Sequence, residues 1–124
     1  MQTIIETYTP TVGDVFVMSW GYDQTNTDAF AVVRCTPKTV WVKPCEMEAV
    51  GEGLSTRLRP ALKDGQPITS EFRWETIGKI LPDGTVRKAI NGTPSFRGYS
   101  FASAYLWNGE RDFYDTLATG QPGR

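Results

Sequence analysis

The chain has 124 residues, with 13 basic side chains against 14 acidic ones and no histidine. This length suits a single domain with a sizeable core. The near-neutral charge argues against a dedicated duplex-DNA binder, because phosphate neutralisation usually needs an excess of Lys and Arg. The absence of histidine removes the usual general base at neutral pH and the commonest metal ligand. The composition therefore favours a globular protein without a metal or other cofactor.

The two cysteines, Cys35 and Cys45, cannot form a structural zinc site without histidine. They are also fewer than a secreted domain stabilised by disulfides usually carries. The N-terminus has no basic region followed by a long apolar one, so we expect no signal peptide. The longest apolar run, residues 29–33, is far too short to cross a membrane. We therefore expect a reduced, cytosolic protein.

Short strands dominate the first half of the chain. Residues 14–20 are rich in β-branched and aromatic side chains and are flanked by glycines, which favours a strand. Residues 30–35 and 39–43 are predicted to form a hairpin around Pro37, since proline suits a turn and cannot sit in a central strand. A three-residue and a four-residue loop both fit, and they would place different residues on the core face. Only one of the two cysteines lies near this turn, so we expect free thiols.

The middle of the chain is the least regular part. A strand is expected near residues 46–50, followed over 51–65 by a loop with one helical turn at most. Residues 71–77 alternate loosely and predict another strand. Residues 79–87 predict a hairpin, because Pro-Asp-Gly at 82–84 is a favourable turn sequence.

Aromatic residues mark the C-terminal part. Their recurrence at odd positions from Tyr99 onward favours one strand over residues 95–107. Asn-Gly at 108–109 is a strong two-residue hairpin signal, with a return strand through 112–114. A short helix over residues 110–118 remains the competing interpretation.

Seven or so short strands with tight turns predict an all-β fold, with at most one or two short helical turns. A small SH3-like, partly open barrel or a sandwich fits this length best. We expect one domain over residues 1–118 and a flexible, Gly/Pro-rich tail over 119–124. One core is expected to hold six aliphatic side chains: Val15, Val17, Val33, Val40, Val42 and Ile80.

Two patterns of carboxylate residues suggest metal binding or catalysis, and both have simpler interpretations. The run from Asp23 resembles the start of a calcium loop, but Asp28 stands where glycine is needed and Arg34 where a bidentate Glu belongs. A carboxylate-dependent hydrolase is a remote alternative, since turn positions favour solvated caps. Its candidate residues are Asp23, Asp28, Glu110 and Asp112.

The stretch Ser19–Asp28 is the main candidate for a binding site. It joins two apolar runs and carries two aromatic rings among many polar side chains. Asp, Asn and Thr side chains often fold onto nearby backbone, so the stretch can be a structural corner only. Loops on rigid β scaffolds are also common binding sites, and Tyr and Trp dominate interface hot spots. The candidate binding residues are Trp20, Tyr22, Asp23, Gln24, Thr25, Asn26 and Asp28.

Each of these residues has an expected role. Trp20 should pack at the mouth of the barrel and donate its N–H to a carboxylate or amide oxygen. Asp23 and Asn26 should bind backbone N–H groups within the loop. The outward-facing residues Tyr22, Gln24 and Thr25 are expected to contact a partner.

A second candidate is a basic and aromatic patch of Arg34, Trp41 and Lys43 on the first hairpin. Such residues can stack on bases or contact phosphates, which indicates a single-stranded nucleic-acid or nucleotide binder. The simpler interpretation is a cation–π contact on an exposed sheet face.

Several blocks resemble a family of small uncharacterised proteins from bacteriophages and other bacterial mobile elements. The first is Gly-Asp-Val-Phe at 13–16, and the most specific is Ser-Trp-Gly-Tyr-Asp-Gln-Thr-Asn at 19–26. Asp28 and the strand over 30–33 continue the pattern, although Ala29-Phe30 stands where the family has two aromatics. Weaker blocks are 38–41 and 104–109.

The resemblance implies a protein encoded by a phage or prophage and located in the cytoplasm of a bacterial host. We expect a non-enzymatic binding module that engages or inhibits a host protein, in an accessory or counter-defence role. The near-neutral charge favours a protein partner over nucleic acid.

Overall fold

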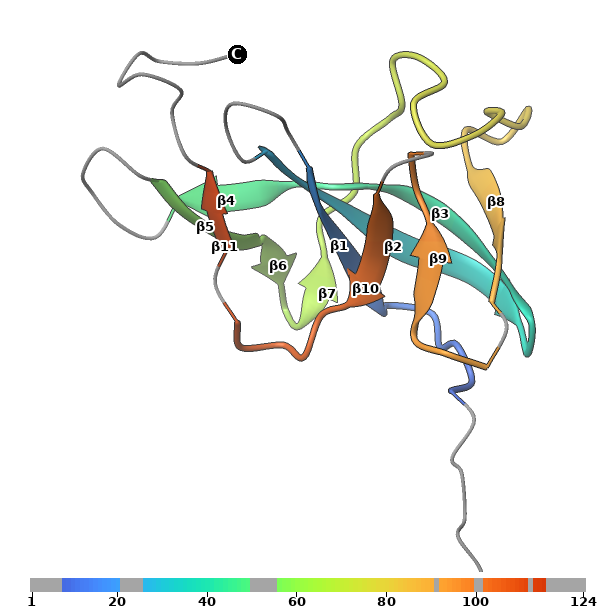
Figure 1. Ribbon diagram of the computed structural model, residues 1–124, viewed down its shortest axis with the longest axis horizontal. Helices are drawn as coiled ribbons and strands as arrows, with labels where there is room; N and C mark the ends of the chain where they lie inside the picture. Colours follow the sequence, from blue (N-terminus) through green and yellow to red (C-terminus); the bar gives the residue numbers. More distant parts are fainter. Residues whose placement is uncertain are drawn as a thin grey trace, which may run out of the picture.

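The regular structure of the described residues consists of β-strands without a helix in this computed structural model (Figure 1). The described residues are 8–20, 26–49, 56–90, 92–99, 102–111 and 113–115. Six antiparallel strands form the main sheet, in the order β8-β3-β2-β1-β10-β9. They are β1 (Val15–Trp20), β2 (Asn26–Thr36), β3 (Thr39–Cys45), β8 (Val86–Ala89), β9 (Ser95–Arg97) and β10 (Ser103–Leu106).

The main sheet bends until its two edge strands, β8 and β9, lie side by side (Figure 1). In the described residues β8 and β9 do not pair with each other, so the barrel is partly open. A three-stranded sheet has the order β11-β5-β4, and β6 pairs with β7. The predicted fold class, a small all-β barrel that is partly open, is confirmed. The remaining strands are β4 (Met47–Ala49), β5 (Thr56–Pro60), β6 (Leu62–Lys63), β7 (Gln66–Pro67) and β11 (Phe113–Asp115).

The β2–β3 hairpin is longer than predicted and has a tighter turn. Thr36 pairs with Thr39, so the turn holds two residues instead of the expected three or four. The register shifts between Val32 and Arg34, which is a β-bulge. Val32 continues the core-facing alternation from Phe30, and the extra residue, Val33, faces outward, where it is 36% exposed. The expected core position of Val33 is therefore wrong.

Both faces of the main sheet are covered, and each has its own apolar cluster. Alternation along β1 sends Phe16 and Met18 into the main core and Val15 and Val17 to the opposite face. The expectation of a single core is thus wrong, because the β11-β5-β4 sheet lies over that second face. The predicted Val40 and Val42 are in the main core, and Ile80 packs against it. The second cluster is Val15, Val17, Ala29, Ala31 and Cys45, with Met47, Trp107 and Phe113 against it.

Two segments in the middle of the chain exchange their expected roles. Residues 71–77 form no strand and follow the edge of β3 irregularly, starting with a hydrogen bond from Ser70 N to Pro44 O. The region expected to be a loop, 51–65, contains β5 and β6 within its described part. β5 has little apolar pattern of its own, and it is a strand because it pairs with β4 and β11.

The expected single strand over residues 95–107 is two antiparallel strands, β9 and β10, with Phe96 opposite Ala104. Tyr105 is consequently 64% exposed, whereas Phe96 is buried. A side chain at Gly98, just after β9, would collide with the Sδ atom of the buried Met18. Glycine there permits the close approach of the β9–β10 hairpin to the core.

The turn at Asn108–Gly109 is present but joins different strands from those predicted. The Asn108 side chain accepts hydrogen bonds from the N–H groups of Glu110 and Arg111. The chain then continues to β11, which pairs with β5 instead of returning along β10. β11 also rules out the competing helix at its described residues, 113–115.

Two smaller predictions are confirmed. The turn at 82–84 forms, with Gly84 N donating to Leu81 O and Ile80 bridging Val86. The backbone at Gly84 has φ of 86°, which glycine adopts without steric cost. Cys35 and Cys45 are both free thiols.

Candidate functional site

The ends of the predicted 19–28 stretch lie in a β-hairpin. Trp20 is the last residue of β1, Asn26 is the first residue of β2, and the two are paired. The sheet therefore fixes the residues on both sides of the connecting segment. The predicted roles of four residues lie outside the described part of the chain: Tyr22, Asp23, Gln24 and Thr25.

Trp20 packs at the end of the barrel, as predicted. Its indole N–H donates to the Oδ2 atom of Asp28 over 2.6 Å. Its ring meets Tyr99 edge to face, with centroids 5.2 Å apart, and the half-buried side chain packs against the main core. The expectation of a nearby carboxylate acceptor is confirmed. Asn26, only 8% exposed, is buried beside it in β2.

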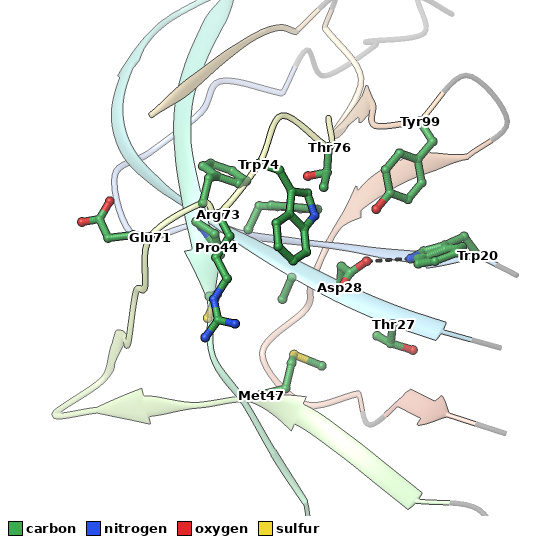
Figure 2. A pocket seen from close by; sticks show the side chains of 14 residues that line it. Trp20, Thr27, Asp28, Pro44, Met47, Glu71, Arg73, Trp74, Thr76 and Tyr99 are labelled. Atoms are coloured by element: carbon green, nitrogen blue, oxygen red, sulfur yellow. Dashed lines mark hydrogen bonds between the residues drawn. The ribbon is translucent and has the colours of Figure 1, made fainter. Parts of the chain in front are cut away.

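An open pocket of about 520 Å³ lies directly beside the Trp20–Asp28 pair (Figure 2). We call it the aromatic pocket. Residues of β2, the end of β3 and the irregular segment 71–76 form its walls, so it combines parts of the chain that are distant in sequence. The lining residues that matter here are Trp20, Asp28, Phe72, Trp74, Thr76 and Tyr99.

Contacts with the main sheet hold segment 71–76 in place. The Phe72 ring stacks on Phe30, with centroids 6.2 Å apart. Lys43 Nζ binds Glu71 Oε1 over 2.9 Å, and Ile80 N donates to Glu75 Oε2 over 3.2 Å. Trp74 remains 67% exposed between these anchors, and its indole points into the pocket (Figure 2).

Sequence reasoning missed Trp74 because its segment was expected to be an ordinary strand. A signal was available: Phe72, Trp74 and Thr76 alternate with the charged residues Glu71, Arg73 and Glu75. Such alternation outside a sheet leaves one row of side chains in need of another surface. Here that surface is the end of the barrel.

Burial and charge shift the acidity of groups around the pocket. Burial raises the pKa of Tyr99, the negative charge of Asp28 raises it further, and a hydrogen bond with Thr76 partly opposes the change. Burial also raises the pKa of the Cys45 thiol to about 11. Both groups are therefore uncharged at neutral pH, and the Asp28 carboxylate faces a phenol and an indole N–H.

The structure brings together only two residues of the second candidate patch. The Arg34 guanidinium lies 4.3 Å from the ring centroid of Trp41, which is the simpler of the two interpretations. Arg34 also lies 3.8 Å from a carboxylate oxygen of Asp83. Lys43 turns to Glu71 instead, so it does not extend this patch. We call the remaining pair the Arg34–Trp41 patch.

The four carboxylates considered for a hydrolase do not form a recognisable centre in the described structure. Asp28 binds Trp20, and Glu110 is an exposed turn residue. Asp23 and Asp112 lie outside the described residues. No group of three or more Cys, Asp or Glu side chains that could hold a metal ion occurs in the described ranges.

No family model, curated protein or solved structure matches the chain. In the described residues, no helix has the length and apolar character needed to span a membrane.

Proposed function

We propose that this chain is a small binding module that engages a protein of a bacterial host, encoded by a phage or prophage and acting in the host cytoplasm. Inhibition of the partner is the simplest consequence, since a module of this size can cover a functional surface by binding alone. The aromatic pocket is the contact site. The observation that carries the proposal is the 67% exposure of Trp74 beside a pocket lined by other aromatic rings.

The exposure of Trp74 favours a role in binding. Apolar area gains roughly 25 cal/mol per Å² when it leaves water, so an exposed indole on a fixed surface retains much unused binding energy. Tryptophan and tyrosine are also the residues most enriched at interface hot spots. The contacts of Phe72 and Glu71 fix the segment that presents Trp74, which limits the entropy lost on binding.

The single-stranded nucleic-acid alternative uses the Arg34–Trp41 patch and has weaker support. A base would have to replace the guanidinium that already covers the Trp41 ring. The charge of Arg34 is also partly balanced by Asp83, and Lys43 is engaged by Glu71. Protein binding through the aromatic pocket requires no such rearrangement.

Affinity capture from bacterial lysate tests the proposal, with nuclease treatment in one arm. The immobilised baits are the natural chain, Trp74→Ala and Tyr105→Ala. Tyr105 is the matched control, because it is 64% exposed but lines a different pocket. We expect a nuclease-resistant protein to be retained by the natural chain and Tyr105→Ala and lost from Trp74→Ala.

Two outcomes would overturn this function. Retention of the partner by Trp74→Ala would place binding elsewhere on the molecule. Loss of the partner after nuclease treatment, together with binding of a single-stranded oligonucleotide that weakens steeply with salt, would favour the nucleic-acid alternative.

A further inference from the structure

The Asp28 carboxylate is the feature of the aromatic pocket that identifies its ligand. The side chain is half-buried and receives a hydrogen bond from Trp20 at Oδ2. No Lys or Arg in the described ranges forms an ion pair with it. Outside these ranges, the sequence contains a single basic side chain, Arg124. A half-buried carboxylate without an ion-pair partner favours a cation as its neighbour.

The two basic residues near the pocket do not supply that cation. Lys43 is bound to Glu71, and the Glu71 carboxylate points away from Asp28 (Figure 2). Arg73 lines the pocket, but its guanidinium is directed away from the Trp20–Asp28 pair (Figure 2). The carboxylate is thus left facing the open space of the pocket.

Aromatic rings flank this carboxylate. Trp74 lies on one side of Asp28 and Trp20 on the other, with Tyr99 near Trp20 (Figure 2). Burial raises the pKa of Tyr99, and the nearby charge of Asp28 raises it further. Trp and Tyr faces attract cations through the ring quadrupole, and Trp does so most strongly.

We propose that the aromatic pocket binds a basic side chain of the protein partner, arginine in preference to lysine, between Trp74 and the Asp28 carboxylate. This inference rests on the proposed function and adds the chemistry of the group recognised. A guanidinium can stack flat on an indole while it donates hydrogen bonds to a carboxylate, which an ammonium does less well. The preference for arginine follows from that geometry.

Other ligand chemistries fit the pocket less well. An anionic group would be repelled by the carboxylate of Asp28, which lines the pocket. A purely apolar side chain would displace water from the carboxylate without replacing its hydrogen bonds, which carries a large desolvation cost. A basic side chain satisfies both the aromatic walls and the charge.

Titration with small probes, followed by NMR of the four tryptophan indole N–H groups, tests this directly. The probes are N-acetyl-arginine amide, N-acetyl-lysine amide and N-acetyl-citrulline amide, the last being a neutral isostere of the first. We expect the arginine probe to shift the Trp20 and Trp74 signals saturably, with a smaller effect from lysine and none from citrulline. The Trp41 and Trp107 signals are internal controls.

Two substitutions separate charge from shape. Asp28→Asn keeps an oxygen that can accept the Trp20 N–H but removes the charge, so affinity for the arginine probe should fall about tenfold. Trp74→Ala should weaken binding to a similar extent, and Tyr105→Ala should not change it. Arg73→Ala should leave binding equal or tighter, because its charge opposes that of the probe.

The inference is overturned if citrulline binds as well as arginine, if Asp28→Asn binds the arginine probe unchanged, if Arg73→Ala loses it, or if no probe shifts Trp20 or Trp74. These failures differ from failure of the proposed function. A partner that is captured through Trp74 but is indifferent to Asp28→Asn would keep the function and remove the basic side chain from it.

Discussion

The aromatic pocket and the Arg34–Trp41 patch are built from the same kinds of side chain but differ in how those side chains are paired. In the patch, the cation already lies on its aromatic ring, and the cation also faces Asp83. In the pocket, the exposed ring of Trp74 and the carboxylate of Asp28 face a common open space. The patch is internally satisfied, whereas the pocket has unused capacity for an external group.

The difference arises from how far apart in the sequence the residues of each region lie. Arg34 and Trp41 face one another across a two-residue turn, so they meet as soon as the hairpin forms. Trp20, Trp74 and Tyr99 come from three separate parts of the chain and meet only when the barrel is complete. The cation and ring of the patch are close in sequence and pair with each other. The groups of the pocket are brought together only by the complete fold and remain available to a ligand.

The thiol of Cys45, in the pocket, gives the largest expected effect. Cys45 lines the pocket with its pKa raised to about 11 by burial, whereas Cys35, next to Arg34 in the chain, is half-buried and packs against the main core. Each pKa unit changes the reactive thiolate fraction tenfold, so iodoacetamide near neutral pH should label Cys45 about a hundredfold more slowly than an unfolded cysteine. Peptide mass spectrometry measures the labelling rate of Cys45 in the folded and in the unfolded protein.

The same shift predicts a pH dependence of stability. A thiol whose pKa is higher in the folded state holds its proton more tightly there, so stability is lost as pH rises from the ordinary cysteine value to about 11. Tyr8 and Tyr99, whose pKa values are also raised, act in the same direction at higher pH. Cys45→Ala should flatten the first part of this decline. Equal labelling of both folded and unfolded Cys45 would show that burial does not protect it.

Trp20→Ala is expected to have the next largest effect. The half-buried ring contacts Tyr99 and donates to Asp28, so its loss should lower the free energy of unfolding by about 2–3 kcal/mol, below the value for a fully buried tryptophan. Urea denaturation measures the change. Trp20→Phe is the control, because it keeps a ring and removes only the hydrogen bond, at a cost of about 1 kcal/mol. A negligible loss for Trp20→Ala would mean that the ring does not support the pocket.

The sequence was informative wherever local contacts decide structure. β1, the turn at 82–84, the Trp20 contact with a carboxylate and the Arg34–Trp41 contact all involve residues close along the chain. Each could be argued from side-chain chemistry and spacing. The all-β class followed for the same reason, because strand patterning and turn residues are local signals.

Most of the failures have the opposite property. β5 is a strand because of its two partners, β4 and β11. The bulge at Val33 is the exception, since it is local but strand propensity does not specify the register of a hairpin. β11 crosses to another sheet although an Asn-Gly turn precedes it. Trp74 enters the pocket because Phe72 and Glu71 anchor its segment to distant residues. The segment that presents Trp74 lies far from Trp20 and Asp28 in the sequence, so its place in the pocket could not be predicted.

The Arg34–Trp41 contact should contribute about 0.5–1 kcal/mol to stability, as expected for a cation–π pair on an exposed surface. A double-mutant cycle with Arg34→Ala and Trp41→Ala, followed by urea denaturation, isolates this coupling. Neither change should alter binding of the arginine probe by the aromatic pocket. If either does, the two regions are not independent and the comparison between them fails.

The two ion pairs are expected to have the smallest effects. Lys43–Glu71 lies beside the aromatic pocket, and Arg34–Asp83 belongs to the Arg34–Trp41 patch. The Lys43–Glu71 pair is short, 2.9 Å, and the Lys43 side chain is only 23% exposed, whereas Arg34–Asp83 spans 3.8 Å with both side chains more than half exposed. Lys43→Met should therefore cost about 0.5 kcal/mol, and Asp83→Asn should change the ion-pair contribution by almost nothing. The measurement is urea denaturation at low and high salt, since screening should reduce the first effect.

The two pairs also differ in their effect on ligand binding. Lys43 helps to hold the segment that presents Trp74, so Lys43→Met should weaken binding of the arginine probe slightly, while Asp83→Asn should not. Unchanged probe binding by Lys43→Met would show that the Lys43–Glu71 pair is not needed to fix the segment.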